Sequence, residues 1–318
     1  MTDSVNTKET TEETPAKVVH RRPGRPLKTK PNLPRPRLGV VDKASDESHY
    51  VEFLYDKPII FKKLWQFFKL MAVDKIHMSF MKDSVGIYCV DHLNKSQIQV
   101  KIDCNNVNHY FCDKELDIGL SSKNIEIIMG TIDKTYNSIL FLSTKDNIQK
   151  NIQVVLKNNT DAKEMHKIEL IGDYNRISNN ANFVDEDYMI KFKLTGKYFK
   201  KMISDIKSFS DQITIKKDGP DENLVFEYIK NDKKIKSTHT MENNSAISLR
   251  DSLGPDDTFR TSFKVDYVKP ISQAYLDETI EIYSDENKPL KFIIQMDEAI
   301  KVTILTQIID YRADVLNV

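Results

Sequence analysis

Two stretches of the chain carry apolar side chains at helical spacing. In each stretch the apolar positions recur every three or four residues, which places them on one face of a helix. The first face contains Ile60, Phe61, Leu64, Trp65, Phe67, Phe68 and Met71, and the second contains Tyr198, Phe199, Met202, Ile203, Ile206 and Phe209. The two helices open on Phe61-Lys62-Lys63-Leu64 and Phe199-Lys200-Lys201-Met202, which lie 138 positions apart. The pattern predicts two related amphipathic helices.

Each predicted helix is followed by the same series of shorter elements. Alternation of apolar and polar residues predicts a pair of strands after each helix, then a second short helix, and then a closing strand pair. In the first half these elements cover residues 87–90, 97–102, 122–129, 138–142 and 153–156, and in the second half 213–215, 224–228, 266–276, 279–283 and 290–296. Two copies of one helix-and-hairpin unit imply a duplicated α+β fold.

The formal charge of the chain is zero, with 47 basic and 47 acidic residues, but the charge is unevenly distributed. Between Ala16 and Val41 there are eight basic residues and no acidic residue, which leaves 39 basic against 47 acidic residues elsewhere. Residues 1–48 also hold six of the eleven prolines and show no hydrophobic period. We therefore expect a disordered basic tail over residues 1–48, joined to a mildly acidic folded body.

Lysines occupy the polar faces of both predicted helices. They are Lys62, Lys63 and Lys69 in the first helix and Lys197, Lys200, Lys201 and Lys207 in the second. A lysine stripe on one helix is usually only a solvated face. Two equivalent stripes in an acidic body favour a phosphate-binding surface, because lysine is a mobile point charge that follows a duplex without reading its bases.

The basic tail contains a short motif that resembles an AT-hook. The residues involved are Arg21, Arg22, Gly24, Arg25, Pro26 and Lys28. Prolines keep such a segment extended, glycine allows close approach, and the arginines enter the narrow minor groove of A·T-rich DNA. Pro23 stands where the first arginine of the usual core would be. A plain basic tail or a nuclear-import signal explains the segment nearly as well.

No motif in the sequence supports catalysis or a bound metal or other cofactor. A Walker loop, an HExxH motif, a nucleophile elbow and a GxGxxG motif are all absent. Cys89, Cys104 and Cys112 form no CxxC pair, so we expect reduced thiols in an intracellular protein. No apolar run of eighteen residues is present, and the N-terminus lacks the apolar region of a secretory signal. We expect neither a membrane span nor enzyme activity.

The order of motifs from residue 50 to 310 resembles that of eukaryotic and archaeal sliding clamps, the family of proliferating cell nuclear antigen. The first clamp domain is represented by residues 61–69, 85–91, 110–113 and 118–120, and the second by residues 210–219 and 289–310. Gly24-Arg25-Pro26 and residues 106–110 resemble the clamp-like protein of asfarviruses and related large DNA viruses. The resemblance implies a homotrimeric ring with β-sheets outside and helices lining a channel for duplex DNA. It divides the chain into residues 1–48, 49–168, 169–184, 185–310 and 311–318, which are the tail, the first domain, a connecting loop, the second domain and a C-terminal tail.

The resemblance assigns roles to the lysine stripes. Lys62, Lys63, Lys69 and Lys201 match channel-facing basic positions, with Lys197, Lys200 and Lys207 in support. The match fails at Ile127 and Gly130, where the family usually has lysines, and at Ser204, where it has arginine. On the last helix only Lys269 remains, beside Pro270. The channel is therefore expected to be less basic than usual.

The resemblance also implies a groove on the front face that receives short peptides from DNA polymerase and from other replication and repair proteins. The candidate groove residues are Val90, Leu93, Phe183, Tyr188, Pro289, Ile304 and Leu305. Such a groove needs exposed apolar side chains that bury an anchoring residue of the partner. The alternative for each residue is an ordinary place in the core.

The resemblance further implies ring closure by pairing of strand edges, with residues 152–157 and 234–240 as the candidate edges. Two other functions remain open. One is a monomeric or dimeric processivity subunit that is held on DNA by charge without encircling it. The other is an AT-hook architectural protein whose folded body is an interaction module. The expected location is a viral replication site, in a cytoplasmic factory or the nucleus.

Overall fold

The computed structural model describes residues 39–160, 162–172, 187–219, 223–230, 233–237, 247–275 and 277–309. The first half contains β1 (His49–Tyr55), α1 (Pro58–Leu70), β2 (Lys75–Phe80), β3 (Ser84–Val90), β4 (Ser96–Asp103), η1 (Cys104–Asn106), β5 (His109–Cys112), β6 (Leu116–Ser121), α2 (Ser122–Thr131), β7 (Tyr136–Thr144), η2 (Lys145–Asn147), β8 (Asn151–Asn158) and β9 (Lys163–Glu169). The second half contains β10 (Ile190–Thr195), α3 (Gly196–Lys207), β11 (Gln212–Asp218), β12 (Val225–Lys230), β13 (Lys233–Ser237), β14 (Ile247–Asp251), β15 (Thr258–Lys264), α4 (Val265–Ala274), β16 (Thr279–Ser284), β17 (Leu290–Gln295) and β18 (Ile300–Thr306).

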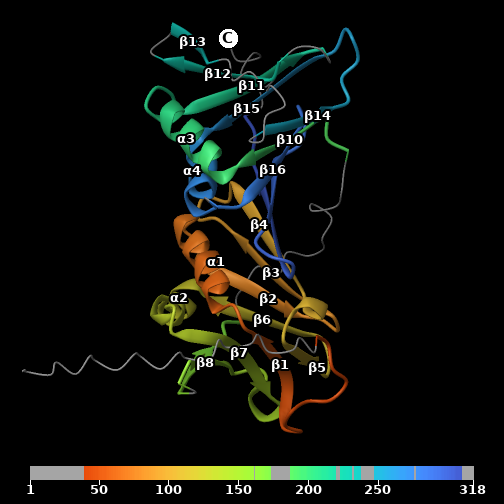
Figure 1. Cartoon of the computed structure of the whole chain (residues 1–318), viewed down its shortest axis with the longest axis vertical. Helices are drawn as coiled ribbons and strands as arrows, with labels where there is room; N and C mark the ends of the chain where they lie inside the picture. Colours follow the sequence, from red (N-terminus) through yellow and green to blue (C-terminus); the bar gives the residue numbers. More distant parts are fainter. Residues whose placement is uncertain are drawn as a thin grey trace, which may run out of the picture. The chain divides into compact units, whose positions relative to one another are not determined.

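The two halves repeat one order of elements, so the expected duplicated α+β fold is confirmed (Figure 1). Each half opens with a strand and a helix, continues through five strands to a second helix, and closes with three strands. The repeat extends past the last strand of each half. The Ile171 N–H donates to the Gly119 carbonyl in β6, and the Ile309 N–H donates to the Ser262 carbonyl in β15. Residues 171 and 309 are again 138 positions apart.

Strand pairing shows how the two halves are joined. The first half supplies a five-stranded sheet, in the order β5-β1-β7-β8-β9, and the second half supplies a four-stranded sheet, in the order β13-β12-β11-β15. The remaining strands form one nine-stranded sheet, β14-β10-β16-β17-β18-β4-β3-β2-β6. Its first five strands belong to the second half and its last four to the first half. Antiparallel pairing of β18 with β4 therefore makes one continuous sheet from the two halves.

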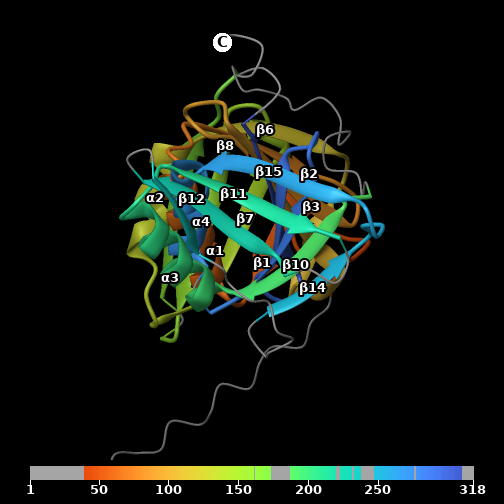
Figure 2. The same cartoon turned by 90° about the horizontal axis from the view of Figure 1, so that it is seen from above.

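Helices α1, α2, α3 and α4 form one layer on one side of the sheets (Figures 1 and 2). The helix α1 contacts α2 within the first half and α4 across the boundary between the halves, and α4 contacts α3. The ring of Phe67 in α1 lies 5.0 Å from the ring of Tyr275, just after α4. The sequence of contacts along the layer is thus α2, α1, α4 and α3, and the side of this layer that faces away from the sheets carries the polar faces of the helices.

An aromatic cluster explains the position of α1 on its sheet. Pro58 at the first helical position fixes a helical backbone angle where no N–H partner is needed. The following apolar face buries Phe61 and Trp65 almost completely, and Phe61 packs 5.8 Å from Phe53 and 5.6 Å from Phe141. Strands β1 and β7 supply those two rings, so the helix and the middle of the five-stranded sheet share one core.

One of the two expected strand edges is wrong. Residues 152–157 lie in β8, which pairs with β7 on one side and β9 on the other, so they form an interior strand. Among the residues that the structure describes, the edge strand on this side of the sheet is β9, which the sequence pattern did not single out. Strand β13 is an edge of the four-stranded sheet, in agreement with the expectation for residues 234–237, while residues 238–240 lie outside the described residues.

The folded body begins before residue 49. Gly39 and Val41 bracket a parallel bridge to Tyr110 in β5, since the Val41 N–H donates to the Tyr110 carbonyl and the Tyr110 N–H donates to the Gly39 carbonyl. Residues 39–48 therefore lie against the body, although the sequence pattern placed them in the tail. Residues 1–38, which include the AT-hook-like motif, lie outside the described residues.

We predict that Phe53→Ala lowers the free energy of unfolding by about 3–5 kcal/mol, because it leaves a cavity among rings that are fully buried. Leu70→Ala is the matched control, since Leu70 is 43% exposed at the end of α1, and it should change stability by about 0.5 kcal/mol or less. Urea unfolding of both variants measures the difference. Equal losses of stability would contradict this description of the core.

Candidate nucleic-acid interface and peptide groove

Lys62 joins the two helices of the first half. Its Nζ donates to the carbonyls of Gly130 (3.2 Å) and Ile132 (2.5 Å), at the C-terminal end of α2. The last carbonyls of a helix lack partners within the helix and carry the negative end of its dipole, so a lysine there is favourable. Lys62 therefore acts on α2, in addition to lying on the polar face of α1.

Acidic side chains hold the other two predicted lysines of α1. Lys69 forms a short ion pair with Glu126 of α2, and both side chains are substantially exposed. Lys63 lies 3.2 Å from Glu278, whose side chain is largely buried where the chain enters β16. Lys63 and Lys69 are thus each paired with a glutamate of this same chain.

In the second half, Lys207 and Lys197 contact aspartates near the two ends of α3. Lys207 lies between Asp211 (2.6 Å) and Asp266 (2.9 Å), and hydrogen bonds to these carboxylates raise its pKa. The hydrogen bond from Lys207 lowers the pKa of Asp211. Lys197 is a looser neighbour of Asp277 at 3.6 Å, with both side chains exposed. These contacts lie at the two ends of α3.

Lys200 and Lys201, in the middle of α3, are exposed and form no ion pair with any described residue. The helix begins at Thr195, whose hydroxyl accepts a hydrogen bond from the Tyr198 N–H and so caps the first turn. Its apolar face then buries Phe199, Met202, Ile203 and Ile206. This anchoring directs the two lysines away from the sheets.

The two short helices contribute few cations to this layer. Ile127 of α2 is 72% exposed and Gly130 is exposed beside it, at the two positions where the sequence lacks the expected lysines. Lys123 is exposed one turn before Ile127. In α4, which contains Pro270, the only lysine is the exposed Lys269. The helix layer as a whole is therefore weakly basic.

Three of the predicted groove residues line one hollow. Tyr188, Pro289 and Leu305 surround a space of about 480 Å³. The Tyr188 hydroxyl donates to the Pro289 carbonyl at 3.2 Å, and its ring makes an edge contact with Tyr283 at 5.8 Å. The hollow lies at the junction of β18 and β4, since the other lining residues are Asn94, Lys95, Gln97 and Gln307. We refer to it as the junction groove.

The remaining groove predictions fall elsewhere. Ile304 is fully buried opposite Ile98 on the core face of the sheet, so its placement in the groove is corrected. Val90 lines an adjacent hollow of about 200 Å³, and Asn94 borders both hollows. Leu93 is 62% exposed on the β3–β4 turn. Phe183 lies outside the described residues.

A buried carboxylate that the sequence pattern did not reveal anchors the start of the folded body. Glu52 of β1 is 1% exposed, and its carboxylate accepts hydrogen bonds from Ser45 and from the Asp46 N–H. Its two oxygens also contact His49 Nδ1 (2.6 Å) and His109 Nε2 (2.5 Å). Burial alone would raise the pKa of Glu52, but the hydrogen bonds from Ser45, His49 and His109 lower it to about 2.

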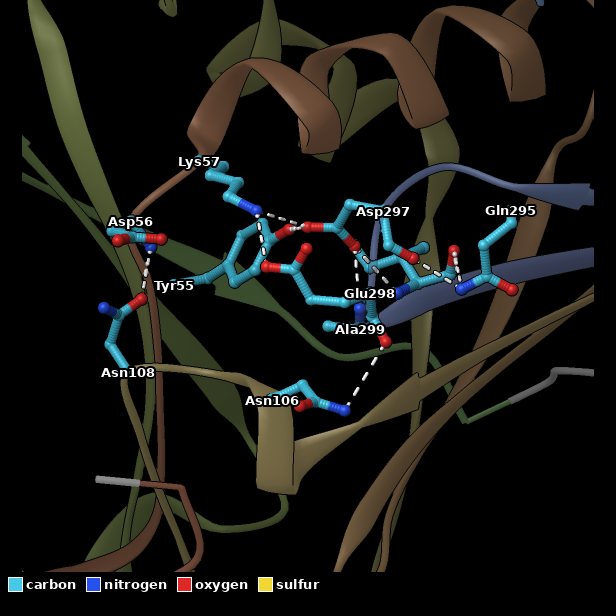
Figure 3. A network of polar contacts seen from close by, with 10 residues as sticks. Tyr55, Asp56, Lys57, Asn106, Asn108, Gln295, Asp297, Glu298 and Ala299 are labelled. Atoms are coloured by element: carbon cyan, nitrogen blue, oxygen red, sulfur yellow. Dashed lines mark hydrogen bonds and ion pairs between the residues drawn. The ribbon is translucent and has the colours of Figure 1, made fainter. Parts of the chain in front are cut away.

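A second such network connects the two halves (Figure 3). The Tyr55 hydroxyl donates to Asp297, and Lys57 Nζ lies 3.0 Å from Asp297 and 3.0 Å from Glu298. The Asn106 side-chain amide reaches the Glu298 carbonyl at 3.5 Å. Burial and Asp297 raise the pKa of Tyr55, so the phenol stays protonated and donates. The β17–β18 turn is thereby held against the β1–α1 junction.

The described residues contain no group of three or more His, Cys, Asp or Glu side chains placed to hold a metal ion. Within the same residues, no helix is long and apolar enough to cross a membrane. Burial raises the pKa of the Cys89, Cys104 and Cys112 thiols, which disfavours the reactive thiolate.

We predict that Glu52→Gln lowers the free energy of unfolding at pH 7 by about 1.5–3 kcal/mol, because charged hydrogen bonds to the carboxylate are removed. The ordinary pKa of this group is 4.5 and its folded value is about 2. Its stabilisation is therefore complete above pH 4.5 and declines as the pH falls toward 2. Urea unfolding from pH 7 to pH 3 should show the two proteins converging, and a constant difference would contradict the assignment.

Comparison with known proteins gives concordant matches. Residues 50–174 match the family model of the N-terminal domain of proliferating cell nuclear antigen (PCNA). The chain is 25% identical over 294 residues to an uncharacterized protein of African swine fever virus (isolate Pig/Kenya/KEN-50/1950), in a match that covers 90% of this chain and 97% of that protein. It is 22% identical over 237 residues to a probable DNA polymerase sliding clamp of Paramecium bursaria Chlorella virus 1, with 73% and 86% of the two chains covered. The crystal structure of PCNA from Thermococcus kodakaraensis matches with a TM-score of 0.69 at 15% identity, over 81% of this chain and 100% of that chain.

Proposed function

The chain belongs to the PCNA-like sliding-clamp family, and from this premise we propose that three copies form a closed ring around duplex DNA and tether a DNA polymerase to it. As in the family, the role is that of a scaffold without catalysis. The observation that carries the proposal is the pair of outer strands β9 and β13, whose counterparts β18 and β4 are paired with each other within the chain.

The equivalence of these strands follows from the repeat. Strand β9 closes the first half as β18 closes the second, and each pairs with the strand before it. Strand β13 follows β12 as β4 follows β3. The outer strand of the second half, β13, thus corresponds to β4, which pairs with β18 inside the chain. The outer strand of the first half, β9, corresponds to β18 itself. Pairing β9 of one copy with β13 of the next repeats the internal joint from copy to copy.

The internal register predicts the register between copies. Val302 of β18 lies opposite Val100 of β4. Through the repeated pairings, Glu164 of β9 corresponds to Val302, and Ser237 of β13 corresponds to Val100. Glu164 of one copy should therefore lie opposite Ser237 of the next. A head-to-tail joint of this kind makes a ring when its rotation closes, as the family resemblance implies for three copies.

A ring built in this way places the helix layer on the inside and the sheets on the outside. The lysines of α1 and α3 then face the phosphates of the enclosed duplex. Encirclement removes the need for tight binding, which agrees with a weakly basic layer in which most of the predicted lysines have intramolecular partners. This weak charge argues against the alternative of a processivity subunit held on linear DNA by charge alone.

The junction groove is the proposed docking site for DNA polymerase and other replication or repair proteins. Its apolar wall consists of the exposed Pro289 and the small accessible parts of Tyr188 (7% exposed) and Leu305 (5% exposed), against which an aromatic or aliphatic side chain of a partner peptide can pack. Viral relatives favour action at an intracellular site of viral DNA replication, in a cytoplasmic factory or the nucleus.

The basic tail is proposed as an additional DNA tether. Gly39 is fixed on β5, and the chain from Arg25 to Gly39 can span at most about 50 Å when extended. A segment of this length is proposed to let Arg21, Arg22 and Arg25 contact DNA that leaves the ring. In this proposal the tail assists the clamp, whereas in the architectural alternative it would be the only DNA-binding part.

We predict that light scattering of the full chain on a sizing column gives three times the protomer mass of 36.9 kDa. Successive N–H groups of a strand point to opposite sides, so one of Met165 and His166 directs its N–H outward from β9. Proline at that position removes the outward N–H. We therefore expect one of the two variants, Met165→Pro or His166→Pro, or both, to lower the assembled mass. A mass of one protomer at every concentration would contradict the ring.

We predict that Tyr188→Ala reduces polymerase stimulation at least about fivefold, because the wall of the junction groove is removed, and that the assembled mass does not change. Leu70→Ala is the control, since Leu70 is exposed at the end of α1 and does not line the junction groove. Primer extension on singly primed circular DNA measures both variants. Equal stimulation by the Tyr188 variant and the parent protein would contradict the docking site.

A further inference from the structure

The lysines of the helix layer fall into two structural groups. In the first group Nζ is held by another part of the chain: Lys62, Lys63, Lys69 and Lys207. The second group is exposed without an ion pair to any described residue: Lys123, Lys200, Lys201 and Lys269. Lys197, with a single loose contact at 3.6 Å, is intermediate. The number of lysines in a helix therefore does not give the charge that the helix can offer to a ligand.

The lysines of the second group are unevenly distributed between the halves. Lys200, Lys201 and Lys269 belong to α3 and α4, whereas α1 and α2 supply only Lys123 among the described residues. The exposed acid on α3 is Asp205, one turn after Lys201. Asp205 follows Lys201 by four residues, and a helical ion pair in which the acid follows the lysine is weaker than one in which it precedes the lysine.

The lysines of α1 are engaged by contacts within the chain, although α1 and α2 together still carry four lysines against one glutamate. Glu126 offsets Lys69, and the carbonyl end of α2 engages Lys62. At the centre of the exposed face of α2, Ile127 offers an apolar side chain that gains nothing from a phosphate. A phosphate that approached this side would compete with these partners for the lysines of α1.

We propose that the DNA contact of this clamp is one-sided, with the α3–α4 surface holding the phosphate backbone through the unpaired Lys200, Lys201 and Lys269, while the α1–α2 surface, whose α1 lysines already have partners within the chain, contributes less. The inference rests on the proposed ring around DNA and adds which residues bind within it. In a ring of three copies, α3–α4 surfaces with unpaired lysines alternate with α1–α2 surfaces whose α1 lysines are engaged. The duplex is then held at spaced positions around the channel.

The test compares paired variants of the full chain. All variants carry Arg21→Ala, Arg22→Ala and Arg25→Ala, so that the tail does not dominate binding. Lys200→Ala with Lys201→Ala removes two exposed cations from α3. Lys69→Ala with Glu126→Ala removes one complete ion pair between α1 and α2 and leaves the net charge unchanged. Fluorescence anisotropy with a 40-base-pair duplex gives the dissociation constant at several salt concentrations, and thermal melting confirms folding.

The slope of log K against log salt should decrease by about 0.9 for each phosphate that the Lys200/Lys201 variant no longer binds. The Lys69/Glu126 variant should keep the parent slope and an affinity within about twofold. Ile127→Lys should tighten binding and steepen the slope, because it adds an unpaired cation to the α1–α2 surface. Equal decreases in slope for the two double variants would overturn the one-sided contact. Failure of the proposed function gives a different result, namely a monomeric parent that does not stimulate polymerase.

Discussion

The antiparallel pairing of β18 with β4 is the constraint on which the rest of this structure depends. Seven residue pairs, from Ile300 opposite Ile102 to Thr306 opposite Ser96, join two copies of one unit into a nine-stranded sheet. Without this joint, each half would present open strand edges that could add another strand. The joint also places Leu305 opposite Gln97, and both residues line the junction groove. One pairing thus determines the connection of the halves and the position of the proposed docking site.

Polar contacts reinforce this joint on the helix side. Asp297 and Glu298, in the turn just before β18, receive Tyr55 and Lys57 from the first half. The Tyr55 phenol is buried, and an unpaired hydroxyl there would be costly, so Asp297 is a required partner. Phe67 and Tyr275 add an apolar contact between α1 and the end of α4. These interactions fix the position of α1 relative to α4, and therefore the relative orientation of the lysine-bearing faces of the two halves.

The sequence predicted the helices α1 to α4 and the strands β3, β4, β7, β8, β11, β12, β16 and β17, because their signals are local, but it missed most of the other strands. The spacing of Phe61, Leu64, Trp65 and Phe68 identifies a helix without knowledge of what it packs against. The edge prediction failed for residues 152–157, because an interior strand and an edge strand have similar patterns, and β9 carries too few apolar residues to stand out. Contacts between distant residues, such as those of Glu52 with His109 and of Lys69 with Glu126, leave no periodic signal. The lysine stripes were visible in the sequence, but the division into paired and unpaired lysines was not.

In the proposed ring the internal joint is repeated between copies, with β9 of one copy in the place of β18 and β13 of the next copy in the place of β4. The most direct test is a cross-link between Glu164→Cys and Ser237→Cys in one chain, treated with a short bismaleimide. We predict a ladder of covalent species that ends at a closed trimer, with little product from either single variant. A product that ends at the monomer, or equal cross-linking when Gln153→Cys in the interior strand β8 replaces Glu164→Cys, would contradict the ring.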